Sequence, residues 1–554
     1  MHASLIARLD RLGPIAREVG QIGAVLGREF GYDLIEQVAL RPAAELRAGL
    51  DRLAEAGLLF CRGVAPHSSY LFKHALVQDA AYGTLLRTKR QELPARVAAA
   101  LNQNFVDLVE RQPELLAHHL TAAGDTARAV DQWLKAGQLA AARSTYREAI
   151  GHLERGISLL SPLPEGSTGN AQEIELQLAL GLCSYTSKGA SSREVGRAYE
   201  RACTLAEKGS NARQLFQAVY GVWATHAGSG RIPPARPFSE RLLRLTDRES
   251  DSELRLQVRH SAWTTAWWSD ELADADAHAE AGRRLYDAEK HHSHRHLYGG
   301  HDPGVCARQV GANSQWLLGY PEKGLTLGSE TLDLAESIAH PFSLLVALGN
   351  VAQLHLCRRE PKLALDLIDR AETLAAEQRL TPTVQPGILR GPAQAMLGAT
   401  DQAVSCIREA LARLERRGAT LYRPYGLASL AETLVCRGEH DPALAALREG
   451  FDNIEATGER WWEAELHRVN GIALVRINRL EEAQHALEEA LRIARRQQAK
   501  SLELRAATSL ARLWAERGRR AEARELLAPV YGWFTEGFDT ADLKDAKALL
   551  DALA

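Results

Sequence analysis

Apolar and small residues recur with helical spacing along the second half of the chain, and the whole pattern repeats. In five segments, a turn residue is followed five positions later by a small residue. These pairs are Gly319 and Gly324, Gly398 and Ala403, Gly438 and Ala443, Asn478 and Ala483, and Gly518 and Ala523. With Ala364 from "EPKLALDLIDRAE" included, the small residues are separated by 40, 39, 40, 40 and 40 positions. A register kept through six units predicts a repeat architecture.

Each unit has the features of two helices joined by a tight turn. An apolar residue follows the small one after four positions, as Ile407 follows Ala403, so both lie on one face of a helix. The preceding helix also carries a small side chain seven residues before the turn. These residues are Ala312, Gly391, Ala431, Gly471 and Ala511. We expect two helices to cross closely there, and a bulkier residue should cost about 1–3 kcal/mol.

The offsets of these small residues resemble those of the tetratricopeptide (TPR) family. The segment "WLLGY" at residues 316–320 partly matches the W-x-x-L-G pattern of that family. A standard unit has roughly 34 residues, so the longer unit requires each helix to gain nearly one turn. Repeats of the HEAT type, with units of roughly 40 residues, are the alternative. The glycine and alanine offsets favour the TPR interpretation.

Residues 1–90 show a different pattern. Helices are predicted at 4–12, 14–26, 31–39 and 43–56, and two short β-rich segments, "GLLFCRG" and "SSYLFKH", flank a turn. Helices followed by a hairpin suggest a winged-helix-like domain. The helix that would read DNA in such a fold, "PAAELRAGLDRLAEAG", has a net charge of −1, which disfavours contact with phosphates. We therefore expect a structural or regulatory role and no nucleic-acid partner.

The predicted fold is all-α. It is a TPR-like solenoid of helical hairpins with a period of about 40 residues and an N-terminal winged-helix-like domain that carries a small β-hairpin. Residues 1–90 form the winged-helix-like domain, residues 91–535 the superhelical array, and residues 536–554 a capping helix. The predicted structural repeat positions are Gly324, Ala364, Ala403, Ala443, Ala483 and Ala523.

Composition narrows the class of protein. The chain has 554 residues and a net charge of −3, with 45% hydrophobic and 25% charged residues, as is ordinary for a folded soluble protein. Its seven cysteines are scattered and form no C-x-x-C pair, which favours buried thiols in a reducing compartment, and we expect a cytoplasmic protein. No uncharged apolar run approaches the roughly 18 residues of a membrane helix, so no membrane contact is expected.

Several segments resemble one group of bacterial signalling proteins. "SLIARLDRLGPIAREVGQIGAVLGREFGYDLI", "LRAGLDRLAEAGLLF" and "YLFKHALVQDAAYGTLL" look like the region that follows the nucleotide-binding core of those proteins. The closing segment from "AKSLELRAATSLARLW" onward is similar to their tail. In that group, a class III adenylate/guanylate cyclase or another output domain precedes an AAA-type (STAND-like) ATPase and a TPR tail. The resemblance implies an upstream ATPase or cyclase core, in cis or in trans.

The chain itself lacks the motifs of such a core. No segment has the P-loop form G-x-x-x-x-G-K-[ST], in which backbone amides and a lysine surround phosphates. "GAVLGRE" has two glycines but no such lysine. No segment resembles the cyclase metal site, and no His, Ser or Cys has the partners of a nucleophilic triad. We expect no catalytic residue, no enzyme activity and no cofactor.

One segment interrupts the repeat. Residues 297–307, "LYGGHDPGVCA", lie in an interval from 275 to 324 that exceeds one period by about nine residues. Insertions in a solenoid often lie on its binding face. The predicted ligand or partner loop therefore consists of Tyr298, Gly300, His301 and Asp302. The alternative is a connector that seats a longer helix, which Asp302-Pro303 would begin.

The same region is rich in side chains that could bind a metal. His291, His292, His294, His296, His301, Asp302 and Cys306 lie within 16 residues. Neutral imidazole is a common ligand of transition metals. The first four histidines nevertheless lack the paired spacing of a closed zinc site, so a solvated loop is the favoured interpretation and no metal site is assigned.

The segment "WTTAWW" places Trp263, Trp267 and Trp268 at helical spacing. Aromatic residues on an array could form a peptide-binding hot spot, but interhelical core is the favoured interpretation. The features together predict a non-catalytic sensory and protein-interaction module of a signalling ATPase or cyclase, which binds a protein segment or small effector in the superhelix groove. The alternatives are a free-standing TPR scaffold and a subunit of a transcription regulator.

Overall fold

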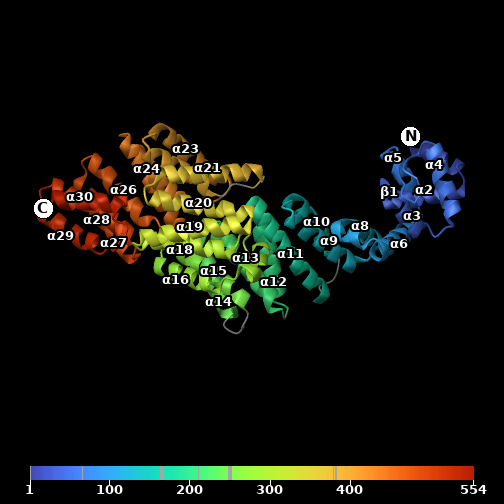
Figure 1. Ribbon diagram of the computed structural model, residues 1–554, viewed down its shortest axis with the longest axis horizontal. Helices are drawn as coiled ribbons and strands as arrows, with labels where there is room; N and C mark the ends of the chain where they lie inside the picture. Colours follow the sequence, from blue (N-terminus) through green and yellow to red (C-terminus); the bar gives the residue numbers. More distant parts are fainter. Residues whose placement is uncertain are drawn as a thin grey trace. The chain divides into compact units, whose positions relative to one another are not determined.

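The computed structural model describes residues 2–64, 66–161, 167–209, 211–246, 252–378, 380 and 384–554 (Figure 1). These residues form thirty α-helices, one short 3-10 helix and three β-strands, so the all-α class predicted from the sequence is confirmed. The chain divides into two compact units, which we call unit 1 (Met1–Leu180) and unit 2 (Gly181–Ala554).

Unit 1 begins with helices and a small sheet. The elements are α1 (His2–Arg11), α2 (Pro14–Leu26), β1 (Glu29–Gly31), α3 (Tyr32–Ala39), α4 (Ala43–Glu55), β2 (Leu59–Arg62) and β3 (Ser69–Phe72). The four predicted helices and the predicted hairpin are all present, in the predicted order. Pro14 begins α2 directly after Gly13, whose positive φ of 86° ends the preceding turn.

The sheet is antiparallel and has the strand order β1-β3-β2. In the hairpin, Leu59 on β2 lies opposite Phe72 on β3. The sequence pattern did not predict β1, because three residues are too few to show an alternation of apolar and polar positions. The ring of Phe30 on β1 packs against Gly23 on α2, where a Cβ atom would lie only 2.7 Å from Phe30 Cζ.

Helical hairpins complete unit 1. The helices are α5 (Ala75–Gly83), α6 (Lys89–Asn104), α7 (Val106–Arg111), α8 (Pro113–Ala123), α9 (Thr126–Ala142) and α10 (Tyr146–Leu160). Gly124 ends α8 with a φ of 82°, and the Asp125 side chain accepts a hydrogen bond from the Arg128 backbone N–H at the start of α9. Ala129 and Ala149 are fully buried where these helices pack. The next helix, α11 (Ser167–Lys188), crosses the boundary between the units.

Unit 2 continues with helices of similar length. The first are α12 (Arg193–Ala206), α13 (Ala212–Gly228), α14 (Ile232–Thr246), α15 (Ser252–Trp268), α16 (Leu272–Leu285), α17 (Ala288–His291) and the 3-10 helix η1 (His292–His296). They are followed by α18 (Pro303–Leu317), α19 (Pro321–Ile338), α20 (Pro341–Cys357), α21 (Pro361–Glu377), α22 (Val384–Met396) and α23 (Thr400–Arg416). The last are α24 (Arg423–Cys436), α25 (His440–Thr457), α26 (Glu463–Arg476), α27 (Leu480–Arg496), α28 (Lys500–Glu516), α29 (Arg520–Gly532) and α30 (Ala541–Ala552).

The predicted turns separate the two helices of each hairpin. Gly319, Gly398, Gly438, Asn478 and Gly518 all have positive φ. Glycine and asparagine tolerate this left-handed conformation best, which is why they recur at 40-residue intervals. Arg359 occupies the same place before Ala364, with a φ of 62°. The first helices of the hairpins, α18 to α28 in even numbers, pack on one another in succession, and the second helices pack beside their own partners.

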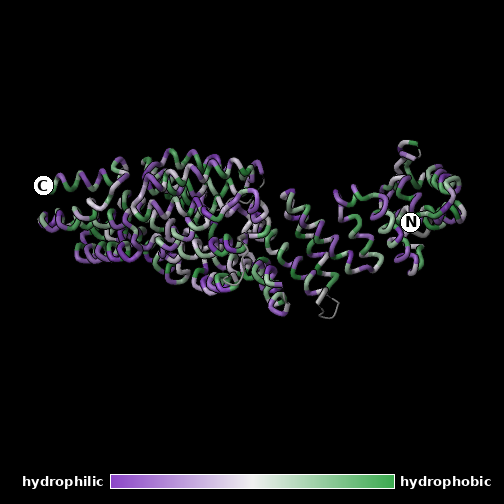
Figure 2. Tube along the Cα trace, turned by 60° about the horizontal axis from the view of Figure 1, so that its bottom comes forward, coloured by the Kyte–Doolittle hydropathy of each residue, from purple (hydrophilic) through white to green (hydrophobic). Residues whose placement is uncertain are grey.

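Small residues form the seams between paired helices, as predicted. The repeat alanines Ala364, Ala403, Ala443, Ala483 and Ala523 are fully buried. A Cβ atom on Gly391 would lie 2.3 Å from Ile407 Cγ1, and one on Gly471 would lie 2.6 Å from Leu487 Cγ. Figure 2 shows hydrophobic and hydrophilic positions alternating along these helices, as paired amphipathic helices require. Unit 2 is therefore a TPR-like helical repeat solenoid.

Segments of unit 2 that lie far apart in sequence also contact one another. The Thr420 Oγ1 hydroxyl donates a hydrogen bond of 2.9 Å to the Ser229 carbonyl, across 191 residues. The Arg460 N–H donates to the Trp268 carbonyl at 2.9 Å, and the Ser501 hydroxyl to the Trp316 carbonyl at 2.5 Å. These three contacts repeat with the period of the array. The loops before α24, α26 and α28 thus pack on the ends of α13, α15 and α18, and one turn of the superhelix closes on the next.

The last helix, α30, covers the end of the array. Leu543, Ala546 and Leu550 on its buried face belong to the same core cluster as Leu510 on α28 and Leu527 on α29. A solenoid needs such a polar-faced end to remain in water. None of the helices in the described part of the chain combines the length and apolar character required to cross a membrane.

Candidate ligand pocket of the repeat array

A cavity of about 300 Å³ lies inside unit 2. Its walls come from α11, α13, α15, α18, α20 and α22 and from the loop between α23 and α24. The apolar lining includes Tyr185, Trp223, Trp267, Phe342 and Tyr422. The cavity therefore lies where the first turn of the superhelix meets the loop of the next turn, and it has walls from both.

Aromatic stacking holds these walls together. Trp267 stacks on Trp461 with a centroid distance of 5.4 Å, and Trp268 contacts Tyr422 edge to face at 5.4 Å. Trp263, Trp267 and Trp268 are 0%, 5% and 8% exposed. The core interpretation of the "WTTAWW" segment is confirmed, although Trp267 and Trp268 also line the cavity. Their partners at 422 and 461 were not predicted, because no local pattern links positions almost 200 residues apart.

Side-chain amides supply the polar part of the lining. The Asn313 amide donates to the carbonyls of Gln309 and Asn350, at 3.0 and 3.3 Å, and ties α18 to α20. The Gln385 amide donates to the Tyr422 hydroxyl at 2.9 Å. Gln309 Oε1 is buried without a hydrogen-bond partner. An apolar cavity with a few fixed hydrogen-bonding groups is the usual form of a site for a small ligand.

His301 is the predicted loop residue that lines the cavity. Its Nδ1 lies 3.0 Å from the Gly299 carbonyl, while its Nε2 is buried and has no partner. Burial lowers the pKa of His301, so the neutral imidazole is favoured. Gly300 has a φ of 76°, and a Cβ atom there would lie 3.0 Å from Thr186 Oγ1. Glycine therefore allows the loop to approach α11.

Asp302 and Tyr298 have structural surroundings. Asp302 is 1% exposed and caps α18, because its Oδ1 accepts hydrogen bonds from the N–H groups of Gly304 and Val305 at 2.8 and 3.1 Å. Its backbone N–H donates to Ser343 Oγ at 2.9 Å. Tyr298 is 2% exposed and lies edge to face against Tyr220 at 5.0 Å. The connector interpretation thus describes Asp302, whereas His301 faces the cavity.

The histidine tract before this loop does not converge on one point. His291 Nδ1 accepts a hydrogen bond from the Asp287 N–H at 2.9 Å, and His294 Nδ1 lies 2.7 Å from Gln257 Nε2. Burial lowers the pKa of His294 to about 4, so the ring is neutral at physiological pH. The side chains of His292 and His296 lie outside the described part of the structure. Of the seven residues singled out in the sequence, His301 and Cys306 come together, and both line the cavity.

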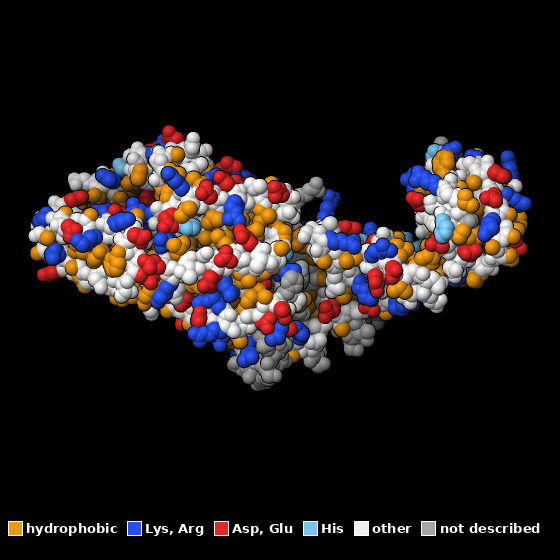
Figure 3. Space-filling view, in the orientation of Figure 1, with side chains coloured by type: hydrophobic (Ala, Val, Ile, Leu, Met, Phe, Trp, Pro, Cys, Tyr) orange, Lys and Arg blue, Asp and Glu red, His pale blue; other side chains and the backbone are white. Residues whose placement is uncertain are grey.

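A second hollow of about 740 Å³ follows the concave surface of α20, α22, α24, α26 and α28 and reaches α30. Figure 3 shows a hollow near α24 and α26, with basic and acidic side chains interspersed around it. Its buried charges are paired, since Arg468 binds Glu465 and Glu432 at 2.9 Å each and Arg505 binds Asp542 at 2.8 Å. Because these charges compensate one another, the hollow lacks a dominant charge that would select an ionic ligand.

Comparisons with known proteins place the chain among proteins of similar build. No known family profile matches it. An uncharacterized protein of Rhizobium meliloti (strain 1021) is 29% identical over 522 residues, which cover 93% of this chain and 50% of that protein. The chain thus spans about half the length of this curated relative.

Several solved structures share helical-repeat geometry with the chain at low sequence identity. A Rap protein complexed with Competence and Sporulation Factor is 13% identical, with a TM-score of 0.48, over 69% of this chain and 100% of that one. A STAND protein with a tetratricopeptide repeat sensor from Pyrococcus horikoshii is 12% identical, with a TM-score of 0.45, over 84% and 66%. The Cut9–Hcn1 hetero-tetramer of the APC/C is 13% identical, with a TM-score of 0.45, over 91% and 89%.

Proposed function

We propose that this chain is a non-catalytic sensory module of a larger signalling system, and that it binds a compact effector, or one side chain of a protein segment, in the cavity of unit 2. The ATPase or cyclase core that responds would be supplied in cis or in trans. The resemblance of the N-terminal segments to bacterial signalling proteins supports the second part of this proposal, and the cavity supports the first.

The position of the cavity is the observation that carries the proposal. A ligand there would touch Trp223 and Trp267 on the first turn and Tyr422 on the loop of the next turn. Contacts to both turns make the affinity depend on how the turns are packed. By linkage, occupancy would shift the packing of the turns by the same free energy. The repeat array thereby converts binding into a change that a neighbouring domain can read.

The lining indicates the chemistry of the ligand. A volume of about 300 Å³ is at the lower end of ordinary ligand cavities, so an extended peptide does not fit inside. The aromatic walls favour a flat or branched apolar body. The amides of Asn313, Asn350 and Gln385 favour a ligand that also carries a hydrogen-bonding group, such as a carbonyl or hydroxyl.

Binding can be tested by thermal unfolding of the purified chain with a library of small aromatic amides and alcohols. We expect a subset to raise Tm and to change tryptophan fluorescence, because Trp223, Trp267 and Trp268 line the cavity. Ala419→Phe should fill the cavity and abolish both responses. Ala548→Phe, at an exposed position on α30, is the matched control and should keep them. Responses that survive Ala419→Phe unchanged would contradict binding in this cavity.

The proposal also assigns no nucleotide turnover to this chain. Purified protein incubated with ATP or GTP and Mg²⁺ should release no more phosphate than a heat-inactivated sample. Turnover that follows the protein through successive purification steps would show that the chain is an enzyme and would overturn this part of the proposal.

A further inference from the structure

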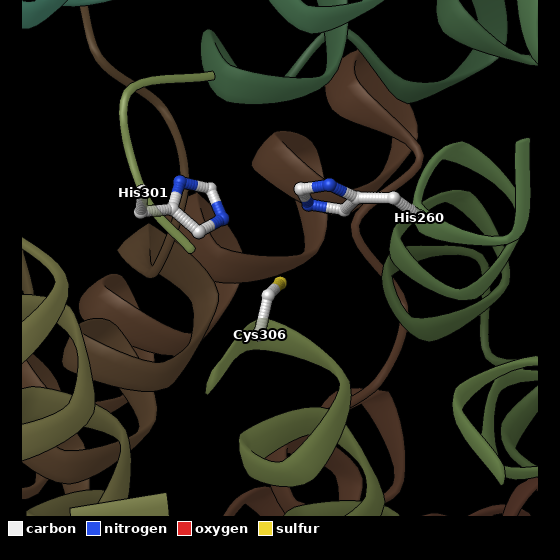
Figure 4. Close-up of side chains that lie close together, drawn as sticks. All are labelled: His260, His301 and Cys306. Atoms are coloured by element: carbon white, nitrogen blue, oxygen red, sulfur yellow. The ribbon is translucent and has the colours of Figure 1, made fainter. Parts of the chain in front are cut away.

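Three side chains that could bind a metal meet at the wall of the cavity. His260 extends from α15, His301 precedes α18, and Cys306 lies in the first turn of α18. One ligand atom from each residue lies within 4.8 Å of the other two. Figure 4 shows a nitrogen of each imidazole and the sulfur of Cys306 turned toward a common space. Within the part of the chain that the structure describes, three such donors converge here from two helices and a loop.

The hydrogen bonds around the imidazoles leave one nitrogen of each ring available. His301 Nδ1 faces the Gly299 carbonyl at 3.0 Å, and a carbonyl only accepts, so Nδ1 carries the proton and Nε2 carries the lone pair. That Nε2 is buried and has no partner. His260 Nδ1 lies 2.9 Å from the Tyr220 hydroxyl and 3.2 Å from Gln257 Oε1. Metal-binding histidines are typically fixed through their second nitrogen in this way.

The sulfur and its neighbours fit the same interpretation. Cys306 is 5% exposed, and its Sγ accepts a hydrogen bond from Trp263 Nε1 at 3.4 Å. Such a donor also stabilises a thiolate bound to a metal. Gln309, one helical turn later, places its Nε2 3.8 Å from the sulfur, while its Oε1 is buried without a partner. An unused buried acceptor beside the three donors is costly unless a further group satisfies it.

We propose that His260, His301 and Cys306 bind one divalent transition-metal ion, with Zn²⁺ as the best fit, and that a further coordination position opens toward the cavity. One thiolate and two neutral imidazoles are a donor set that suits Zn²⁺, and three protein ligands with one open position distinguish a reactive or ligand-binding zinc site from a purely structural one. In a tetrahedral site the ligand atoms lie about 3.5 Å apart, so the group must close by about 1 Å. Binding displaces the thiol proton of Cys306 to solvent.

This inference is independent of the proposed effector. The open position would make the ion a contact point for any ligand that carries an oxygen, nitrogen or sulfur donor, because all three residues line the cavity. The metal can be tested alone, without knowledge of the effector, and effector binding can be tested in the presence of a chelator. The two proposals therefore fail or succeed separately.

Co²⁺ is a suitable probe, since it replaces Zn²⁺ and gives visible absorption. We expect the chelator-treated full chain to bind one equivalent, with an intense thiolate-to-cobalt charge-transfer band and tetrahedral ligand-field bands that Zn²⁺ abolishes. Cys306→Ser should remove the charge-transfer band. His260→Gln and His301→Gln should each weaken Zn²⁺ binding by more than about 100-fold, because loss of a supporting residue alone costs about 10–100-fold.

The control variants keep the test specific. Cys357→Ser, at another buried thiol, and His294→Gln, in the neighbouring histidine tract, should both leave the stoichiometry and the band unchanged. Circular dichroism verifies that each variant is folded. The wild-type spectrum decides the question if a variant does not fold: absence of a charge-transfer band at saturating Co²⁺ would overturn the proposal. Binding that survives Cys306→Ser with the same band would overturn it as well.

Discussion

Glu459 is a fully buried carboxyl group in the loop between α25 and α26. Both of its oxygens accept hydrogen bonds from the Tyr422 N–H, at 3.1 and 3.0 Å, and Oε1 also accepts one from Trp461 Nε1 at 2.9 Å. These donors favour the ionised form, but burial outweighs them and raises the pKa of Glu459 from 4.5 to about 8. The residue therefore stays protonated at neutral pH while joining the loops of two adjacent repeats.

The raised pKa of Glu459 gives stability a definite pH dependence. Between about pH 4.5 and 8 the folded state holds a proton that the unfolded state has released, so this contribution is full below pH 4.5 and is lost as pH rises through 8. Glu459→Gln should remove it, because the amide stays neutral and its oxygen still accepts both donors. The difference in Tm between wild type and Glu459→Gln should therefore shift in favour of the variant as pH rises, by the equivalent of a few kcal/mol.

The control for this measurement is Glu455→Gln on α25, since Glu455 is exposed and pairs with Arg460 at the surface. Its pH profile should run parallel to that of the wild type. A Glu459→Gln profile that is also parallel would show that the buried carboxyl does not titrate in this range.

Individual site residues differed in how far the sequence revealed them. Asp302 before Pro303 predicted a helix start, and the residue does cap α18, because capping depends on neighbours two and three positions away. His260 gave no signal, since a single histidine within an amphipathic helix is usually a core residue. Only the packing of α15 against α18 brings it beside His301 and Cys306.

At the scale of the elements, the helical hairpin is the unit that the sequence encodes most directly. Its turn needs a residue that tolerates positive φ, and its seam needs a small residue on each helix. Both requirements act between positions close in sequence, so both appear as a local pattern. By contrast, β1 depends on pairing with β3 across 40 residues, as Phe30 pairs with Tyr70, and the pattern of three residues did not show it.

Gly391 and Gly471 test the seam. A Cβ on either would lie under 3 Å from the side chain of the facing helix, at Ile407 and Leu487 respectively. We expect Gly391→Ala and Gly471→Ala each to reduce the free energy of unfolding by about 1–3 kcal/mol through overpacking. Urea unfolding followed by circular dichroism would measure the change.

Gly196 on α12 provides the matched control, because the nearest atom to a Cβ there is 3.8 Å away. Gly196→Ala should be neutral or stabilise the protein by up to about 1 kcal/mol, since alanine loses less conformational entropy than glycine on folding. Equal effects at the three glycines would show that helix propensity, and not close crossing, determines the result.

At the scale of the whole of unit 2, stability depends on contacts between successive turns of the superhelix. Trp267 and Trp461 are both buried and stack with an interplanar angle of 28°. We expect Trp267→Ala and Trp461→Ala each to cost about 3–5 kcal/mol. The double variant should cost less than the sum by about 0.5–3 kcal/mol, because each single change already removes the shared contact.

The matched comparison uses Trp514, which packs in the separate core cluster of α28 to α30. Trp267→Ala and Trp514→Ala should be additive within about 0.5 kcal/mol in the same urea experiment. If Trp267 and Trp461 are equally additive, the two turns unfold independently, and a ligand in the cavity could not couple them.

The sequence by itself determined the helical hairpins, their 40-residue period, the turns and the small-residue seams, because each depends on backbone conformation and packing between neighbours along the chain. Tertiary structure decided how the turns of the superhelix close on one another, and with that the cavity, the stack of Trp267 on Trp461 and the meeting of His260 with His301 and Cys306. Small rotations between successive hairpins add up along a solenoid. Which distant residues meet therefore depends on the sum of many interfaces, and no local pattern records that sum.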